Sequence, residues 1–215
     1  VFQHLGNLSP AQLRDTPLYA TVRAAGDGGE ALARAMDDAG HQRGHSRWSF
    51  ARDLGPARLV VIDSRAGRDV TPGRRRIVDD GEWAWIREQA AVEATHLLIA
   101  SSVPVLLSPG LHHLQAWDEA VADGAWGGLM RRAGEKIRRL GVLDHWASFD
   151  QSFREMVALA DDAAHGRLGP APASVVMLSG DVHHCYLAEV GFRPGGRPRA
   201  PVWQAVCSAF RKELE

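Results

Sequence analysis

The sequence predicts an α/β protein, and three observations lead to that prediction. Short apolar runs at 59–62, 96–100 and 175–178 have the length, β-branched content and flanking turn residues of buried strands. Between them lie longer segments whose apolar residues recur at helical spacing. Two of the strands end in a loop that carries an aspartate, which is the end where α/β sheets place their ligands. Strands that alternate with helices favour a layered α/β architecture.

The first fifty residues combine helical signals with a polar loop. Ser9 and Pro10 predict the cap and the first residue of a short helix. Residues 30–39 show a second helical pattern, which follows a glycine-rich break at 24–29. Residues 40–52 hold histidines and arginines around two aromatic side chains, and we interpret them as a surface loop.

Two helices are predicted in the middle of the chain. The first follows the acidic run 79–82, because carboxylates stabilise the start of a helix. Its buried stripe would comprise Trp83, Ile86, Ala90 and Ala94. The second is the longest in the chain, with Asp144 as its N-cap. Its apolar face would comprise Trp146, Phe149, Phe153, Val157 and Ala160, which repeat at helical spacing. Extended segments are further expected at 187–190 and 202–206.

Between these two helices, residues 108–127 are predicted to form a loop-rich insertion. Trp117 and Trp126 flank an acidic stretch and are expected to pack this insertion. His112 and His113 form a histidine pair within it, and we interpret both as surface residues.

Composition excludes several classes of protein. The 215 residues are 45% hydrophobic and 24% charged, as in an ordinary globular domain. A net charge of −1 gives no general attraction to nucleic acid or to a membrane. The chain has no apolar run of membrane-spanning length. Oligomeric state stays open.

The two cysteines, Cys185 and Cys207, are predicted to be buried thiols, because they lie in separate apolar runs. Their spacing is not that of a zinc site. Without visible use of disulfides, a cytoplasmic location is slightly favoured over export.

The most informative stretch is 174–186, where a predicted strand is followed by Gly180, Asp181, His183 and His184. Because alternate residues of an extended segment point to the same side, Asp181 and His183 are expected to face one metal ion. Iron, manganese, zinc and calcium accept such ligands. The alternative is a polar turn with solvated histidines. A catalytic metal site needs at least three protein ligands, so the others must come from elsewhere.

A second aspartate-bearing loop follows the strand at 59–62. Asp63 and Arg65 are expected to fix this loop through an ion pair or a turn. Arg65 is also a candidate substrate ligand, because the adjoining basic run 68–76 and the planar arginine fork suit a phosphate. A solvated run of charge is the alternative explanation.

Several stretches of the chain resemble the PhoD-like (alkaline phosphatase D) branch of the calcineurin-like metallophosphatases. The segment Gly180-Asp-Val-His-His184 is the most specific of them. The others are the segments 3–7, 60–65, 79–86, 100–104 and 144–149.

This resemblance implies a four-layer αββα sandwich with a two-metal site. Such enzymes hydrolyse phosphate monoesters or diesters of small molecules through a metal-activated water. Asp181 and His183 match metal ligands of the family, and His184 is implied to orient the site or to bind the substrate as a catalytic residue. The pair of metal ions implied is Fe/Ca, Mn/Mn or Zn/Zn.

The sequence also departs from the family pattern. Two aspartates and an asparagine that complete the family's metal cage have no counterpart here. We therefore expect residues 1–215 to be the C-terminal portion of a single metallophosphatase-like domain, weakly active or inactive alone. The main alternative is a degenerate, non-catalytic sandwich that acts as a binding module. A serine hydrolase built from Ser179, His183 and Asp181 is disfavoured, because no Gly-x-Ser-x-Gly elbow is present.

Overall fold

The chain divides into two compact units, which are Val1–Phe50 and Ala51–Glu215. We describe them separately from a computed structural model. The structure describes residues 8–41, 47–71, 73–122, 124–127, 145–191 and 198–208. The segment 3–7 and Asp144, which the sequence analysis singled out, lie outside these ranges.

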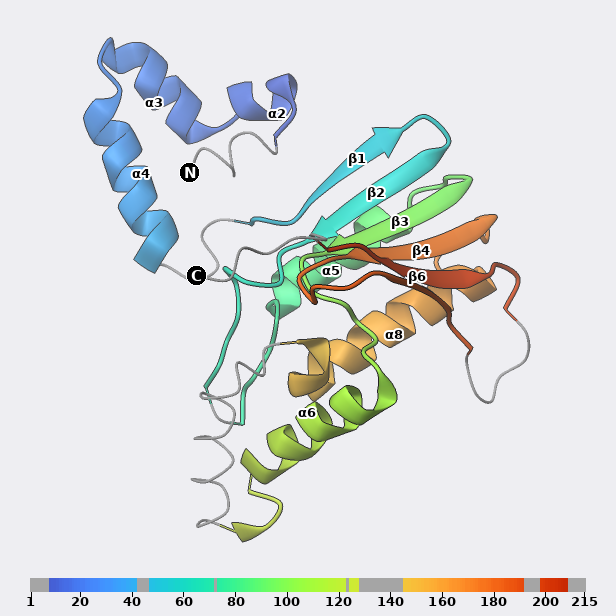
Figure 1. Cartoon of the computed structure of the whole chain (residues 1–215). Coiled ribbons are helices and arrows are strands. Elements are labelled where there is room, and N and C mark those ends of the chain that lie inside the picture. Colours follow the sequence, from blue (N-terminus) through green and yellow to red (C-terminus); the bar gives the residue numbers. More distant parts are fainter. Residues whose placement is uncertain are drawn as a thin grey trace. The chain divides into compact units, whose positions relative to one another are not determined.

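Within its described residues, the first unit contains the helices α2 (Pro10–Arg14), α3 (Pro17–Ala25) and α4 (Gly29–His41), drawn in blue in Figure 1. Ser9 caps α2 as predicted. Its hydroxyl accepts from the Gln12 N–H, while the Gln12 side chain accepts from the Ser9 N–H, which forms a reciprocal capping box. Thr16 caps α3 in the same position. The sequence analysis did not predict α3.

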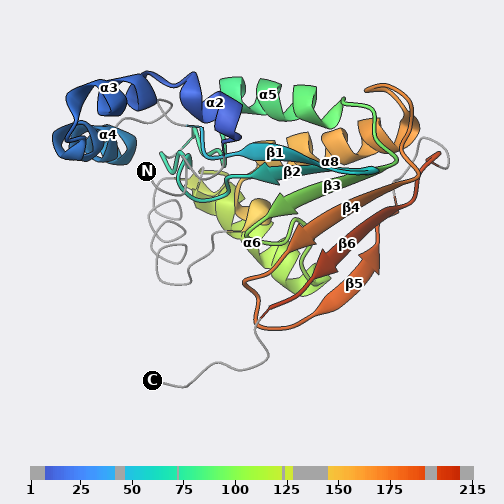
Figure 2. The same ribbon diagram turned by 90° about the horizontal axis from the view of Figure 1, so that it is seen from above.

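The second unit contains a six-stranded sheet of order β1-β2-β3-β4-β6-β5, seen from two directions in Figures 1 and 2. Its strands are β1 (Phe50–Leu54), β2 (Ala57–Ile62), β3 (His96–Ser101), β4 (Ser174–Ser179), β5 (Tyr186–Glu189) and β6 (Val202–Val206). Strands β2, β3, β4 and β6 are parallel, and β5 runs antiparallel to β6. This confirms the predicted α/β class and five of the strands. β1 corrects the prediction of a loop over residues 40–52.

Helices α5 (Asp80–Ala90) and α8 (Asp150–His165) connect the parallel strands and cover one face of the sheet (Figure 1). The core between them and the sheet is formed mainly by Val60, Ile62, Leu97, Ile99, Val175, Met177, Ile86, Met156 and Leu159. Asp79 caps α5, and Trp83, Ile86 and Ala90 are buried as predicted. Ala94 lies beyond the end of that helix.

The predicted loop-rich insertion is wrong, because α6 spans Pro109–Ala122. Its buried residues include Gln115, Asp118 and Glu119, whereas Leu111 and Leu114 are exposed. A helix with a polar buried face lacks the apolar periodicity that identifies helices from sequence. Trp117 and Trp126 contact each other with an edge-to-face geometry and a centroid separation of 5.6 Å, but both side chains are exposed, so they do not pack this segment as predicted.

The longest helix starts later than predicted. Trp146 and Phe149 are buried, but Trp146–Ser148 form the short 3₁₀ helix η1 ahead of α8. The Glu119 carboxylate accepts from the Asp150 N–H at 2.9 and 2.8 Å. A carboxylate at this position stabilises the positive end of the helix dipole, so a side chain of α6 defines where α8 begins.

The second face of the sheet, opposite α5 and α8, is also apolar. Its side chains form two cross-strand rows in the parallel register. The rows are Leu59, Leu98, Val176 and Trp203, and then Val61, Ala100, Leu178 and Ala205. All eight remain partly exposed. Parallel sheets that are buried on both faces show this pattern of continuous apolar strands.

Candidate functional site

The candidate site lies at the carboxyl ends of the parallel strands. Strands β2, β3, β4 and β6 end at the same edge of the sheet, so the residues that follow them come together. These residues are 63–67 after β2, Ser102 after β3, 180–185 after β4, and Cys207 and Ser208 after β6.

Asp63 folds the loop after β2. Its carboxylate accepts from the backbone N–H groups of Arg65, Ala66 and Gly67 at 2.8 to 2.9 Å. This confirms the turn that the sequence analysis offered as one interpretation of Asp63. The same turn carries Arg65, whose side chain reaches the loop after β4.

Arg65 forms an ion pair with Asp181, which brings two predicted site residues together. The Arg65 Nε–H also donates to the Ser102 hydroxyl at 3.3 Å, and that hydroxyl lies 2.6 Å from the Ser64 hydroxyl. The side chains of Arg65 and Asp181 are 50% and 46% exposed. An ion pair this accessible to water adds little to the stability of the fold. Its main effect is to hold the loops after β2 and β4 next to each other.

The loop 180–185 is not extended, which corrects the expectation that Asp181 and His183 point the same way by strand alternation. Both residues have positive φ, 67° at Asp181 and 56° at His183. Alternation applies only to β conformations. Left-handed residues other than glycine are uncommon, and they cluster at functional sites.

Two contacts with the end of β6 hold this loop. Gly180 packs closely against the end of β6: a Cβ added there would lie 3.0 Å from the Cys207 carbonyl oxygen, so a larger residue would require this oxygen to shift. The Val182 N–H donates to the Ser208 hydroxyl at 3.1 Å. The carboxylate and imidazoles of the loop are therefore presented on a backbone fixed at two points.

His184 has a defined tautomer. Its Nδ1 lies 2.6 Å from the Val182 carbonyl oxygen, and because that oxygen can only accept, Nδ1 carries the proton. The Nε2 atom of the neutral ring then keeps its lone pair for a metal or a proton. The ring stacks on Tyr186 with a centroid separation of 5.4 Å and an interplanar angle of 22°.

Tyr186 is fixed by a hydrogen-bond network that the sequence analysis did not identify. Its hydroxyl donates to the Leu106 carbonyl and accepts from the Gln204 amide at 2.8 Å. Burial raises the pKa of Tyr186, against the hydrogen bond from Gln204. Gln204 is fully buried and also accepts from the Leu106 N–H at 2.8 Å. A glutamine inside an apolar strand is the signal that could have identified it.

The prediction of buried thiols is wrong, because Cys185 and Cys207 are both exposed. Cys185 lies immediately before β5 and Cys207 immediately after β6, so neither is part of a strand. Their sulfur atoms are 3.6 Å apart. The hydrogen bond with Cys185 and the charge of that neighbour raise the pKa of Cys207.

Within the described ranges, no three His, Cys, Asp or Glu side chains are grouped so that they could hold a metal ion. Asp181 and His183 share a loop, but these residues alone do not complete a metal site. The Ser179 hydroxyl is buried and has no hydrogen-bond partner in the same ranges. A serine relay would require a bond between this hydroxyl and His183.

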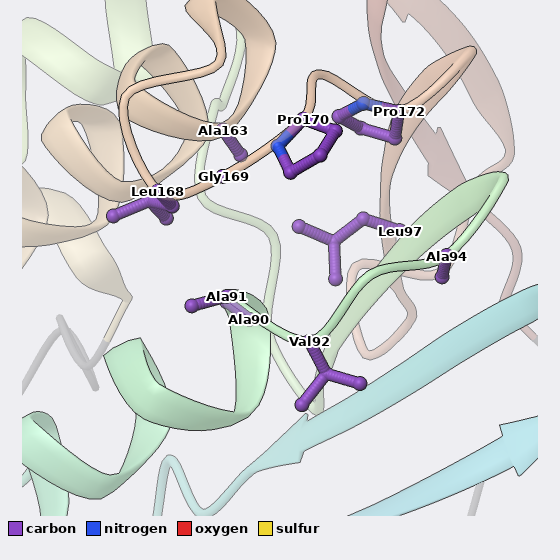
Figure 3. A pocket seen from close by; sticks show the side chains of 10 residues that line it. All are labelled: Ala90, Ala91, Val92, Ala94, Leu97, Ala163, Leu168, Gly169, Pro170 and Pro172. Carbon is purple, nitrogen blue, oxygen red and sulfur yellow. The ribbon is translucent and has the colours of Figure 1, made fainter.

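A separate hollow lies near the amino end of β3, where the ends of α5 and α8 meet it (Figure 3). The side chains that line it are all apolar and include Leu97, Val92, Leu168 and Pro170. It contains no charged side chain that would bind a phosphate. It is therefore distinct from the residues at the carboxyl ends of the strands.

Comparisons with known proteins gave no match to a family model, a curated protein or a solved structure. None of the helices in the described ranges combines the length and apolar character needed to cross a bilayer.

Proposed function

We propose that the chain belongs to a metal-dependent phosphoesterase that hydrolyses phosphate monoesters or diesters. The observation that carries the proposal is the meeting of two loops at one edge of the sheet. The loop after β2 contributes Arg65, and the loop after β4 contributes Asp181, His183 and His184. A metal-assisted phosphoryl reaction requires side chains that bind the cation and an arginine fork that binds the phosphate, and residues of both kinds are found here.

In this proposal, Asp181 and His183 supply two of the metal ligands, and the remaining ligands come from outside the described residues. Bound metal ions of this class lower the pKa of a water molecule and neutralise charge on the phosphoryl oxygens. Asp181 would exchange its ion pair with Arg65 for the cation. Arg65 would then be available to donate two N–H groups to phosphate oxygens, and His184 would orient the substrate through its Nε2 atom.

For the fold, we propose more specifically that the chain forms one half of an αββα sandwich. The two apolar rows on the second face of the sheet support it, because a face of this composition gains free energy when another layer covers it. Such a layer would also place further side chains at the carboxyl ends of the strands.

A non-catalytic binding module is the second candidate function. The observation that favours it is the lack of a three-ligand metal group among the residues described. A degenerate member of a metallophosphatase family would keep the sheet and the Arg65–Asp181 contact but would bind no catalytic metal.

The metal content of the purified chain tests the phosphoesterase against the binding module. We would load the purified chain with manganese, zinc or iron, remove free metal, and measure the bound metal by mass spectrometry. Asp181→Asn is the test variant. Asp150→Asn is the control, because Asp150 is an exposed carboxylate that pairs with Arg154 on α8. The phosphoesterase proposal expects bound metal that Asp181→Asn loses by about tenfold or more in affinity and Asp150→Asn retains.

Hydrolysis of p-nitrophenyl phosphate and of its bis-ester is the second measurement on the same samples. Turnover that requires both metal and Asp181 would support the phosphoesterase and would show which ester class it prefers. Absence of metal from the wild-type chain is the result expected of the binding module and also of a chain that carries only part of the metal cage. Metal retained equally by Asp181→Asn and wild type would refute the assignment of Asp181 as a ligand.

A further inference from the structure

We propose that Cys185 and Cys207 form a thiol–disulfide redox site, in which the two thiols close reversibly into an intramolecular disulfide. Their sulfur atoms are already 3.6 Å apart although the residues are 22 positions apart in the sequence. A disulfide requires a separation of about 2.05 Å, which a modest rotation of the side chains provides. The proposal does not rest on the proposed phosphoesterase activity, although both cysteines lie at the same edge of the sheet as the candidate site.

The strand register supplies the backbone geometry. In the antiparallel pair of β5 and β6, Tyr186 is opposite Val206 and Leu187 is opposite Ala205. The next pair outward in the same register is Cys185 opposite Cys207. Directly opposite residues of antiparallel strands have Cα atoms about 4.5–5.5 Å apart. Disulfides span Cα separations of about 4.4–6.8 Å, so the backbone need not move far.

The position of Cys207 is held by its own hydrogen bond. The Cys207 N–H donates to the Ser179 carbonyl at 3.0 Å, which continues the pairing of β6 with β4 beyond the strand. Both thiols are exposed, so a small oxidant has access to them. The chain has two cysteines in all, so no other intramolecular pairing competes.

The oxidant we propose is a low-molecular-weight disulfide, RSSR. One cysteine thiolate attacks a sulfur of RSSR, which breaks that S–S bond and releases one RSH after protonation. The resulting mixed disulfide is attacked by the second cysteine thiolate, which forms the Cys185–Cys207 bond and releases the second RSH. The protein thiols lose two hydrogens and are oxidised, while RSSR is reduced to two RSH.

The experiment measures how far the fold favours this bond. The full chain is equilibrated with mixtures of reduced and oxidised glutathione, quenched in acid and analysed by mass. The ratio of protein disulfide to protein dithiol, at known concentrations of reduced and oxidised glutathione, gives the effective concentration of one protein thiol towards the other. The same titration in denaturant gives the value for the unfolded chain. Cleavage by trypsin after Arg199 separates the two cysteines, so two joined peptides identify the bond.

We expect an effective concentration at least about tenfold higher in the folded than in the unfolded chain, with the two peptides joined. Cys185→Ser and Cys207→Ser are matched controls that should yield only mixed disulfides with glutathione. An effective concentration that is equal in the two states, or lower in the folded state, would overturn the proposal. Oxidation that gives only mixed disulfides or cross-linked dimers of the wild-type chain would overturn it as well.

Discussion

The Arg65 guanidinium pairs with the Asp181 carboxylate across 116 positions of sequence, and this contact joins the loops after β2 and β4. Both side chains are about half exposed. Water screens charges in such a position, so the pair contributes to the arrangement of the site more than to the stability of the fold. The first prediction separates these two contributions.

Replacing Arg65 with alanine should lower the free energy of unfolding by less than about 1 kcal/mol, because exposed ion pairs contribute no more than that. Urea denaturation measures the change. Ile86→Ala is the comparison, since Ile86 is fully buried in the core and its truncation should cost about 2–5 kcal/mol. A loss above about 2 kcal/mol for Arg65→Ala would contradict the assignment of a mainly positional role.

Gln204→Ala should lower the free energy of unfolding by more than the small number of side-chain atoms removed would suggest. The fully buried side chain bonds to both backbone groups of Leu106 and to the Tyr186 hydroxyl. Its removal leaves a buried N–H without an acceptor, at a cost of about 1–3 kcal/mol in addition to the lost packing. Tyr186→Phe is the control, because it removes the hydroxyl but keeps the two bonds between Gln204 and the Leu106 backbone. We expect the control to lose less stability, as measured by thermal and urea unfolding.

Gly180→Ala should disturb the candidate site, because the new Cβ would meet the Cys207 carbonyl oxygen at 3.0 Å. We expect a destabilisation of about 1–3 kcal/mol and weaker protection of the Val182 amide in hydrogen exchange. Gly110→Ala is the matched control, since no atom lies within 4 Å of the Cβ it would add in α6. Alanine favours a helix over glycine, so the control should be neutral or slightly stabilising. Equal effects of the two substitutions would argue against a close approach at Gly180.

His112 should make stability depend on pH. Burial lowers its pKa, and the charge of His113 lowers it further; the ring also packs on Phe153 with centroids 4.8 Å apart. A folded-state pKa below the unfolded value favours the neutral form in the fold. Its stabilisation is therefore complete above the unfolded pKa of about 6.5 and is lost as the pH falls through the folded value.

Urea midpoints between about pH 7 and pH 5 test this dependence. The decline should be shallower in His112→Gln than in wild type, and intermediate in His113→Gln, which removes only the smaller cause. A decline of equal slope in His112→Gln and wild type would rule out His112 as a contributor.

Five of the six strands could be predicted from the sequence because the signals for them are local, whereas β1 was missed. The runs at 59–62, 96–100, 175–178 and 202–206 each carry enough apolar, β-branched residues to identify a buried strand. The sequence also indicated that the Asp63 and Asp181 loops follow the carboxyl ends of strands, where α/β sheets place their ligands. That these two loops meet through Arg65 and Asp181 is known only from the structure.

The details that the sequence analysis missed depend on contacts between distant residues. Helix α6 was missed because tertiary contacts bury Gln115, Asp118 and Glu119, so its buried face is polar. The conformation of Asp181 and His183 depends on contacts with Cys207 and Ser208, which follow another strand. The exposure of the two thiols depends on where strands end, and strand boundaries are the least certain part of a sequence-based prediction.

The insertion of β6 between β4 and β5 has a consequence for synthesis on the ribosome. When β5 has emerged, it has no partner in the sheet and β4 is paired on one side only, with β3, because β6 comes last of the three strands. The edge of β4 then presents unpaired backbone groups, which can pair with another chain. Residues 202–208 close that edge and anchor the loop of Asp181 in one event. A nascent chain that stalls before residue 202 would expose an open edge and an unformed site together.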